Sequence, residues 1–319
     1  MSLPFLQNYL GLSTGLQTRQ TSSSSSSGAT RGIFAGGYAT TVASNVIDYI
    51  TIATTGNATD FGDQSVTRYE IGAVGSSTRA VFAGGYGSTG NTNVIDYITI
   101  ATTGNAIDFG DLTLIRRGFA GVNSSTRGCF GGGIGGGYTD TIDYITIATT
   151  GNAIDFGDLS NSRQGSGGVN SETRGVFGGG ENSSVGTTNI IDYITIATTG
   201  NAIDFGDLTE ARKICPAGAN SETRGVFAGG RTGQGTNTID YITIATTGNA
   251  TDFGDLTIAP YGNSGCGSFT RGVFGGGYAQ SLGYQNTMDY ITIATTGNAT
   301  DFGDLTLARY TLVGSQNGL

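Results

Sequence analysis

The sequence predicts an all-β fold: a single six-bladed β-propeller whose blades are four-stranded antiparallel sheets. Three observations lead to this prediction. The stretch IDYITIATTGNAIDFGDL at 142–159 returns with few changes to make six copies, and the aspartate of its DY motif recurs every 47 to 49 residues. Each repeat carries signals for four short strands and shows no sustained helical periodicity. Four short strands in a repeat of this length are typical of a propeller blade.

The strands of a repeat follow one another in a fixed order. A Gly- and Ala-containing segment such as 114–125 forms the first strand, and RGVF running into glycines forms the second. IDYITIAT is rich in β-branched and aromatic residues and forms the third strand, which a Gly-Asn turn joins to DFGDL as the fourth. A lone blade leaves both of its faces uncovered, so we expect the blades to cover one another in a ring.

The two ends of the chain supply one strand more than the ring needs. The expected domains are an N-terminal docking peptide at 1–15, a Ser-rich tether or surplus strand at 16–30, and the propeller at 31–319. The C-terminal YTLVGSQNG has more strand-forming residues than the serine run at 22–27. We therefore predict that the C-terminal segment enters the first blade as a clasp that closes the ring; closure by the N-terminal copy is the alternative.

Each repeat resembles a kelch repeat, in which a glycine pair, a tyrosine and a later aromatic residue recur. In the fourth repeat these are Gly178-Gly179, Tyr193 and Phe205, and all six repeats have Phe where kelch repeats usually carry Trp. The repeat sequence is also similar to kelch-like propellers found among marine bacteriophage virion proteins of the tail or decoration type. This resemblance implies the fold and a location in a virion made in the host cytoplasm. The arginine of the kelch first strand has counterparts at Arg68, Arg163, Arg212 and Arg309.

Charge and composition exclude several classes of function. The chain has 15 basic and 24 acidic residues, a net charge of −9 and no basic stripe, which argues against nucleic-acid binding. The absence of histidine rules out Ser-His-Asp and Cys-His catalysis and imidazole metal sites. No apolar run reaches the roughly 18 residues of a membrane span, so we expect no membrane insertion. We predict a non-enzymatic protein with no cofactor and no metal.

The repeated charged residues are expected to have structural roles. The aspartates of the D-x-F-G-D motif, such as Asp204 and Asp207, are predicted to cap turns and to pair with repeated arginines; calcium binding is the alternative. The arginine of the TRG or TRA motif is predicted to make an Arg–Asp pair in every blade seam; anion binding is the alternative. This structural ring consists of Arg31, Arg79, Arg127, Arg174, Arg224 and Arg271.

The repeats differ most in the loop after the glycine pair. In a propeller this loop shares a face with the connections between blades, while the TTGN hairpins lie on the opposite face. The loops are rich in Tyr, Ser, Thr, Asn and Gly, which suit adaptable polar recognition; the alternative is that they vary because nothing constrains them. The predicted ligand contacts on this loop face are Tyr38, Tyr86, Tyr138, Glu181, Arg231, Tyr278 and Tyr284.

The N-terminal stretch LPFLQNYLGL is predicted to dock into a neighbouring subunit, with the serine run as its tether. The alternative is that it covers the open face of its own propeller. The apolar residues that would make the docking contacts are Leu3, Phe5, Leu6, Tyr9 and Leu10.

Together these features predict a virion-associated interaction protein. Its N-terminal peptide would bind other virion proteins, and its loop face would bind a host-surface glycan or receptor. The alternative is a purely architectural protein that bridges capsid or tail subunits. A glycan hydrolase is a remote third interpretation, because a pair of carboxylates can cleave a glycoside but an active site needs a break in the repeat symmetry. The acidic residues that break the symmetry are Glu70, Asp140, Glu172, Glu181, Glu210 and Glu222.

Overall fold

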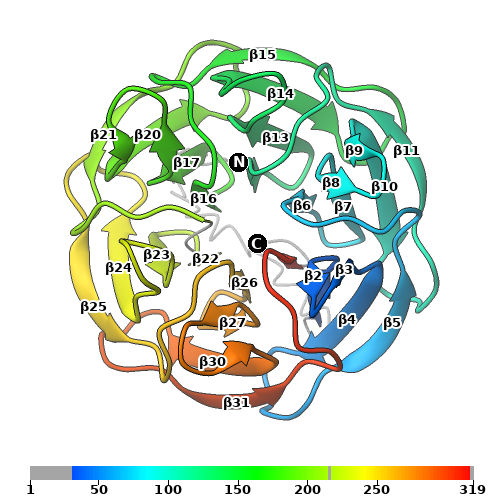
Figure 1. Cartoon of the computed structure of the whole chain (residues 1–319). Coiled ribbons are helices and arrows are strands. Elements are labelled where there is room, and N and C mark those ends of the chain that lie inside the picture. Colours follow the sequence, from blue (N-terminus) through cyan, green and yellow to red (C-terminus); the bar gives the residue numbers. More distant parts are fainter. Residues whose placement is uncertain (1–30, 215–216, 317–319) are drawn as a thin grey trace, which may run out of the picture.

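The computed structural model describes residues 31–214 and 217–316 of the chain. In this part of the chain six four-stranded antiparallel sheets stand around a common axis, and no helix is present. Figure 1 looks along the axis and shows the sheets following one another around the ring. The predicted all-β propeller with six four-stranded blades is confirmed. The predicted docking peptide and Ser-rich segment, at 1–30, lie outside the described residues.

Each blade contains an innermost, a second, a third and an outermost strand, and we number the blades in chain order from the one that contains β1. From blade 1 to blade 6, the innermost strands are β32 (Val313–Gln316), β6 (Gly72–Gly75), β12 (Ala120–Asn123), β16 (Gly167–Asn170), β22 (Ala217–Asn220) and β26 (Ser264–Gly267). The second strands are β1 (Arg31–Ala35), β7 (Arg79–Ala83), β13 (Arg127–Gly131), β17 (Arg174–Gly178), β23 (Arg224–Ala228) and β27 (Arg271–Gly275).

The outer half of each blade is the hairpin that the repeated IDYITIATTGNAIDFGDL sequence forms. The third strands are β4 (Val46–Thr51), β10 (Val94–Thr99), β14 (Thr141–Thr146), β20 (Ile190–Thr195), β24 (Thr238–Thr243) and β30 (Thr287–Thr292). The outermost strands are β5 (Thr59–Asp63), β11 (Ile107–Asp111), β15 (Ile154–Asp158), β21 (Ile203–Asp207), β25 (Thr251–Asp255) and β31 (Thr300–Asp304).

Blade 1 takes its innermost strand from the end of the chain. Strand β32 pairs antiparallel with β1, so that Ile33 stands opposite Ser315 and Ala35 opposite Val313. Blade 1 is therefore built from two segments that lie far apart in the sequence, as Figure 1 shows for the blue and red strands. That this pairing acts as a clasp, holding the ring against unfolding, stays a prediction.

Glycine backbones pack against one another at the axis. A Cβ at Gly121 in β12 would clash with the carbonyl oxygen of Ala73 in β6, and one at Gly218 in β22 would clash with that of Gly168 in β16. The innermost strands therefore approach one another as closely as bare backbone allows.

The hydrophobic core lies between adjacent blades. Phe156 of blade 3 packs in one cluster with Phe177 and Ile194 of blade 4. In the same way Phe34 of blade 1 packs with Val273 of blade 6. Full burial of such a side chain contributes about 1.5–3 kcal/mol. Stability thus comes from the contacts between blades, which is why the repeat has to be iterated.

The TRG arginines do not make the predicted pairs with aspartate in the part of the chain that the structure describes. The guanidinium of Arg174 lies 4.2 Å from the ring centroid of Tyr193, and its Nη1 donates to the carbonyl oxygen of Ile244 in the next blade at 2.9 Å. The strand register explains the difference, because Arg174 stands opposite Thr195, three residues beyond Asp192 along β20. The other five TRG arginines lie over tyrosine rings in the same way.

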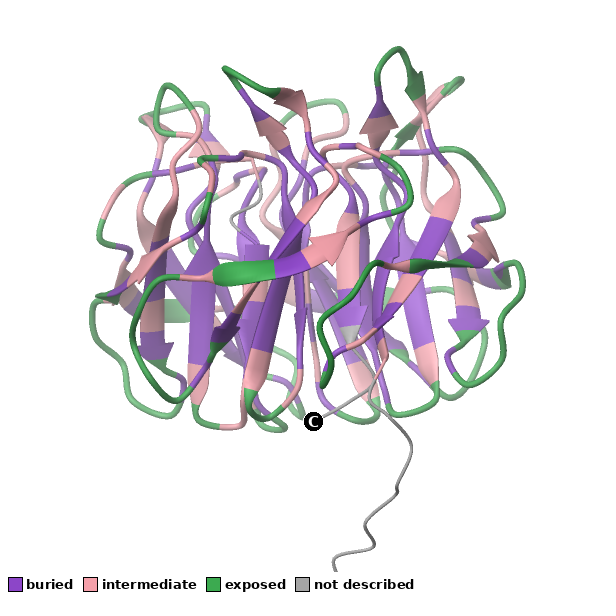
Figure 2. Ribbon diagram, turned by 90° about the horizontal axis from the view of Figure 1, so that it is seen from below, coloured by how far each residue is buried: buried purple, intermediate pink, exposed green. Residues whose placement is uncertain are grey.

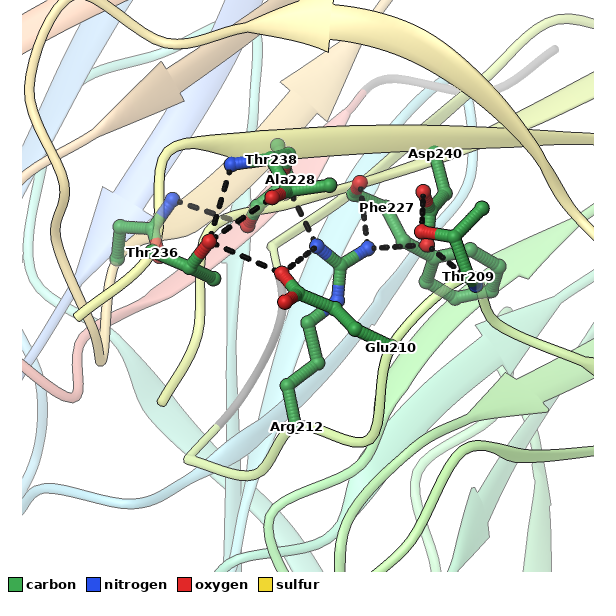
Figure 3. A network of polar contacts seen from close by, with 9 residues as sticks. Thr209, Glu210, Arg212, Phe227, Ala228, Thr236, Thr238 and Asp240 are labelled. Carbon is green, nitrogen blue, oxygen red and sulfur yellow. Dashed lines mark hydrogen bonds and ion pairs between the residues drawn. The ribbon is translucent and has the colours of Figure 1, made fainter. Parts of the chain in front are cut away.

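The buried ion pairs use a different arginine and a different aspartate. The arginine is the one that precedes the innermost strand in blades 1 to 5, and the aspartate belongs to the DY motif rather than to D-x-F-G-D. In blade 5, Arg212 Nη2 donates to Asp240 Oδ2 at 2.8 Å, and both side chains are fully buried. Figure 3 shows that Arg212 also donates to the carbonyl oxygens of Phe227 and Thr238. The equivalent pairs are Arg309–Asp48, Arg68–Asp96, Arg116–Asp143 and Arg163–Asp192.

The lower face of the ring is formed by the TTGN hairpins, each of which rests on the neighbouring blade. In one of them Gly248 N donates to the carbonyl oxygen of Phe205 at 2.7 Å, and Asn249 Oδ1 accepts from Asp207 N at 3.1 Å. The aspartates of D-x-F-G-D therefore contribute backbone donors to this contact, and the predicted pairing of their carboxylates with arginines is wrong.

The opposite face carries the variable loops, and we call it the upper face. Four of these loops fold into short hairpins, which project along the upper edge of Figure 2. The hairpins pair β2 (Tyr38–Ala39) with β3 (Val42–Ala43), β8 (Tyr86–Gly87) with β9 (Gly90–Asn91), β18 (Glu181–Asn182) with β19 (Gly186–Thr187), and β28 (Tyr278–Ala279) with β29 (Gly283–Tyr284).

The described residues include no helix that is long and apolar enough to cross a membrane.

Candidate binding face

Two positions in each repeat build the inner part of the upper face. One is the residue after the glycine pair that ends the second strand. The other lies in the connection that leads to the innermost strand. In five of the contacts between adjacent blades, which we call seams, it directly follows the buried arginine, and in the sixth seam it follows Pro260. An antiparallel β-bridge joins the two positions in every seam, so the same pair of backbone positions recurs six times around the ring, with different side chains. The bridged pairs are Tyr38–Tyr310, Tyr69–Tyr86, Arg117–Ile134, Gln164–Glu181, Lys213–Arg231 and Tyr261–Tyr278.

The glycine pair determines where the first of these positions lies. Gly36 and Gly37 have φ of 63° and 104°, in the left-handed region that glycine tolerates best. A Cβ at Gly36 would lie 2.7 Å from the carbonyl oxygen of Arg68, so a larger residue would also collide with the next connection. The chain therefore turns sharply out of β1 and delivers Tyr38 to the upper face.

Seven tyrosines of blades 6, 1 and 2 form one continuous cluster, which we call the tyrosine cluster. Its ring centroids are 5.2 Å apart for Tyr38–Tyr69, 5.9 Å for Tyr38–Tyr310 and 5.4 Å for Tyr278–Tyr284. Most pairs meet edge to face, which is a favourable geometry for aromatic rings. The members are Tyr38, Tyr69, Tyr86, Tyr261, Tyr278, Tyr284 and Tyr310.

The rings of the tyrosine cluster are packed against one another yet remain open to solvent. Tyr86 is exposed and the other six side chains are half-buried. The hydroxyl of Tyr284 donates to the carbonyl oxygen of Thr40 at 3.2 Å and so links the hairpins of blades 6 and 1. Burial, with nearby tyrosines and Glu70, raises the pKa of Tyr310 to about 12. This phenol stays neutral over the physiological pH range and keeps its hydrogen as a donor.

The other half of the upper face, in blades 3 to 5, is polar. A pocket of about 130 Å³ opens there. Lys213 Nζ donates to Glu181 Oε1 at 2.5 Å, and Arg231 Nε donates to the carbonyl oxygen of Gly233 at 3.2 Å. The guanidinium of Arg231 also lies over the ring of Tyr261, 5.3 Å from its centroid, and so connects the pocket to the tyrosine cluster. The side chains that line the pocket are Glu70, Gln164, Glu181, Lys213, Ile214 and Arg231.

Glu70 lies between the two halves. Its Oε2 is 3.3 Å from Arg117 Nε, and the guanidinium of Arg117 lies over the ring of Tyr86, 4.8 Å from the centroid. Burial raises the pKa of Glu70, and the neighbouring Arg117 opposes that rise. A charged chain of contacts thus runs from the pocket to the rim of the tyrosine cluster.

Five backbone hydrogen bonds link six residues around the axis on the upper face. Gly118 N donates to the carbonyl oxygen of Glu70 at 2.8 Å, and Glu70 N donates to that of Thr311 at 3.0 Å. The six ring residues have positive φ, and three of them are not glycine: Glu70, Ile214 and Thr311, with φ of 54°, 62° and 50°. A β-branched residue in this region is strained by about 1–3 kcal/mol, and such strain clusters at ligand-binding sites. Ile214 and Thr311 therefore hold these backbone conformations at an energetic cost.

Clustered metal ligands and reactive thiols are not found on this face among the described residues. The described residues contain no cluster of three or more His, Cys, Asp or Glu side chains that could hold a metal ion. Two cysteines lie elsewhere, inside the blades, and burial raises the pKa of the Cys129 thiol to about 12 and also raises that of Cys266. Neither thiol is a ready nucleophile.

The structure brings together most of the side chains predicted as ligand contacts. Tyr38, Tyr86, Tyr278 and Tyr284 belong to the tyrosine cluster. Glu181 and Arg231 both line the polar pocket. Tyr138 lies in blade 3, where it bridges Ile134, and it makes no ring contact with the tyrosine cluster in the described residues. The predicted docking residues Leu3, Phe5, Leu6, Tyr9 and Leu10 lie outside the described residues.

Sequence reasoning missed three members of the tyrosine cluster and four side chains that line the pocket, those of Glu70, Gln164, Lys213 and Ile214. Tyr69, Tyr310 and Lys213 directly follow the buried arginine of their seam, and Tyr261 follows the proline that takes its place. The signal was available as a single variable position next to an otherwise repeated one. Only one residue varies at this position, whereas each loop after the glycine pair varies over its whole length, so the variation is much more evident in the loops.

No protein-family model and no curated protein sequence matches this chain. The fold therefore rests on the structure, and the relationship to kelch-like virion proteins stays a prediction.

Proposed function

We propose that this chain is a non-enzymatic binding protein whose upper face recognises a glycan on a host surface. The observation that carries the proposal is the tyrosine cluster, in which seven half-open rings adjoin a pocket of charged and amide side chains. An aromatic surface of this size beside fixed hydrogen-bonding groups is uncommon for a face without a ligand.

Tyrosine suits such a ligand because each ring offers an apolar face and a hydroxyl. The C–H faces of a pyranose ring can stack on the phenol rings, while the sugar hydroxyls can bind the tyrosine hydroxyls and the charged groups of the pocket. Tyrosine also supplies this area at little cost in conformational entropy. Packing of the rings against one another fixes their orientation before a ligand arrives, which reduces the cost of binding.

We further propose that the protein acts on a virion, as a tail or decoration protein. This part rests on the similarity of its repeat sequence to bacteriophage propellers. The N-terminal peptide would attach it to other virion proteins and leave the upper face free. Removal of residues 1–20 should then abolish assembly while glycan binding is retained.

An architectural role is the second candidate, and the hairpin tips favour it. Val42, Val185 and Leu282 stand at the tips of three hairpins on the upper face and are 62%, 71% and 62% exposed. Apolar tips that project from a face suit a protein partner better than a saccharide. In that case the upper face would bind another virion subunit.

A glycan array probed with the full-length chain separates the two candidates. We expect binding to a defined set of glycans, lost in the double variant Tyr38→Ala/Tyr278→Ala. The matched control is Tyr138→Ala, which removes a tyrosine of the same face outside the tyrosine cluster. A blank array, together with capture of virion subunits that depends on Val42 and Leu282, would favour the architectural role. Equal array signals from all variants would disprove glycan binding by the tyrosine cluster.

A further inference from the structure

The seams between blades contain a recurring cage of oxygen atoms. In blade 2 the guanidinium of Arg68 donates to the carbonyl oxygens of Phe82 at 3.3 Å, Gly84 at 3.0 Å and Val94 at 2.6 Å. The fourth oxygen belongs to the carboxylate of Asp96. Three backbone carbonyls and one carboxylate therefore converge on a single positive group.

Blade 3 repeats this arrangement. Arg116 donates to the carbonyl oxygens of Phe130 at 3.0 Å, and of Gly132 and Thr141 at 2.6 Å each. Its Nη2 also donates to Asp143 Oδ2 at 2.9 Å. In blades 1, 4 and 5 the arginine also donates to the equivalent phenylalanine carbonyl oxygen and pairs with the equivalent aspartate. In all five blades the arginine is supplied by the connection from the preceding blade.

Blade 6 has the same backbone cage, but its connection supplies no arginine. Phe274 stands opposite Asp289 in the strand ladder, as Phe82 stands opposite Asp96 in blade 2. Gly276 N donates to the carbonyl oxygen of Thr287 at 3.1 Å, as Gly84 N does to that of Val94 at 2.9 Å.

Pro260 occupies the arginine position of this seam. Its carbonyl oxygen accepts from Gly230 N at 3.1 Å, just as that of Arg116 accepts from Gly85 N at 2.9 Å in the seam of blade 3. The proline side chain ends at Cδ within its own ring, so it brings no donor and no charge to the cage.

Asp289 is therefore a buried carboxylate that no lysine or arginine pairs with among residues 31–214 and 217–316. It is 4% exposed, and its described hydrogen-bond partners are Thr257 N at 2.9 Å and Thr257 Oγ1 at 2.7 Å. Burial is the main cause that raises its pKa. An ionised carboxylate out of water is costly unless it is paired with positive charge.

We propose that the seam of blade 6 binds a monovalent cation between the Asp289 carboxylate and the carbonyl oxygens of Phe274, Gly276 and Thr287. One negative charge is balanced by one positive charge, and the hard oxygen ligands suit an alkali ion or ammonium. Calcium and magnesium sites usually supply more than one carboxylate, which makes a divalent ion the poorer match. The cage also fits a guanidinium group, because arginine fills it in the five other blades.

The bound ion would support the tyrosine cluster from below. Pro260 directly precedes Tyr261, and the ring of Tyr261 contacts those of Tyr278 and Tyr310 at centroid distances of 5.4 and 6.2 Å. In the other seams the buried arginine anchors this same connection. The cation takes over that role where the chain provides proline.

Melting temperatures of the full-length protein in different chloride salts at constant ionic strength test the proposal. Potassium, sodium, ammonium and methylguanidinium are compared with choline, which is too large for the cage. At ten times its Kd, a cation that fits should raise the Tm by about 3 °C over choline. The shift should disappear in Pro260→Arg, which brings its own guanidinium, and in Asp289→Asn, which removes the charge.

Crystals soaked in rubidium chloride give a direct readout. We expect an anomalous scattering peak between Asp289 and the three carbonyl oxygens in the wild type and no such peak in Asp289→Asn. Equal Tm values in all salts, a shift with calcium alone, or a shift of the same size in Asp289→Asn would each overturn the proposal. If Pro260→Arg fails to fold, Asp289→Asn alone decides between these outcomes.

Discussion

The lower and upper faces of this ring are built from the same six repeats, yet only the lower face is the same all the way round. On the lower face each TTGN hairpin binds the next blade through backbone and asparagine contacts, as Gly248 and Asn249 do. On the upper face the bridged positions also have a common backbone, but their side chains change from tyrosine to charged groups. A position that holds the ring together keeps its residue, and a position that only presents a side chain is free to differ.

The comparison implies that the frame and the upper face can be damaged separately. Frame variants should lose stability and keep binding while they remain folded. Upper-face variants should lose binding and keep stability.

Deletion of residues 309–319 should have the largest effect. It removes β32 from blade 1 together with the buried Arg309 and Leu312. Loss of a buried pair member costs about 3–5 kcal/mol, and loss of a large core side chain about 2–5 kcal/mol. Thermal unfolding should show a drop in Tm of more than 10 °C or no cooperative transition; deletion of 317–319 is the control. An unchanged Tm would disprove the clasp.

The buried carboxylates should divide into two classes. Asp240→Asn removes the fully buried carboxylate that pairs with Arg212 and leaves only the partly exposed Glu210, whose Oε1 is 3.8 Å from Arg212 Nη1. The variant should cost about 3–5 kcal/mol in urea unfolding. Asp289→Asn, measured without a cation that fits its cage, should cost less than about 1 kcal/mol or stabilise the protein, because no arginine faces Asp289. Equal losses in the two variants would show that the seam of blade 6 does not differ from the others.

Arg174→Ala tests the corrected role of the TRG arginines. It removes the hydrogen bond to the carbonyl oxygen of Ile244 and the cation over Tyr193. These contacts are worth about 2–3 kcal/mol together, and binding by the upper face should not change. Destabilisation as large as that of Asp240→Asn would favour the buried ion pair that was first predicted.

The pH dependence of stability should differ between the wild type and Asp289→Asn. A carboxyl group whose pKa is raised by folding binds its proton more tightly in the native state, so it stabilises the protein as the pH falls through that pKa. As the pH is lowered from 7 towards 3.8, the ordinary pKa of this carboxyl group, the free energy of unfolding of the wild type should rise relative to that of Asp289→Asn. Parallel curves, measured in choline chloride, would contradict this sign.

Much of the repeated framework of the blades could be predicted from the sequence, because the same strand and turn signals occur in six copies. The period, the β-branched third strand and the Gly-Asn turn indicate the blade, and the apolar residues of YTLVGSQNG point to the strand that joins β1. The partners of the buried arginines could not be predicted in this way. Two aspartate motifs recur equally often, and Asp192 and Asp204 even stand opposite each other in the strand ladder. Only the packing of the blades shows that Asp192 is buried beside Arg163, whereas Asp204 is exposed.

The upper face was predicted in part for a related reason. Tyr38 and Tyr278 follow a glycine pair in an evidently variable loop, which marks them as exposed. Tyr310 lies in a connection whose sequence resembles that of the repeated frame. It meets Tyr38 only because a β-bridge brings together the two ends of the described chain. Contacts of this kind depend on how the ring closes. A repeat pattern implies that the ring is closed, but it does not show which residues of the first and last strands stand opposite each other.

Glycan binding by the tyrosine cluster can be tested by measuring the affinity of the full-length protein for a glycan found on the array. Isothermal titration calorimetry would compare the wild type, Tyr38→Ala/Tyr278→Ala and the control Tyr138→Ala. The comparison requires that thermal unfolding first shows Tm values that agree to within a few degrees. Loss of two anchoring aromatic side chains should raise the Kd by at least about tenfold, whereas the control should stay within about twofold. The same Kd in all three proteins would contradict the account, because the tyrosine cluster would then not be the binding surface.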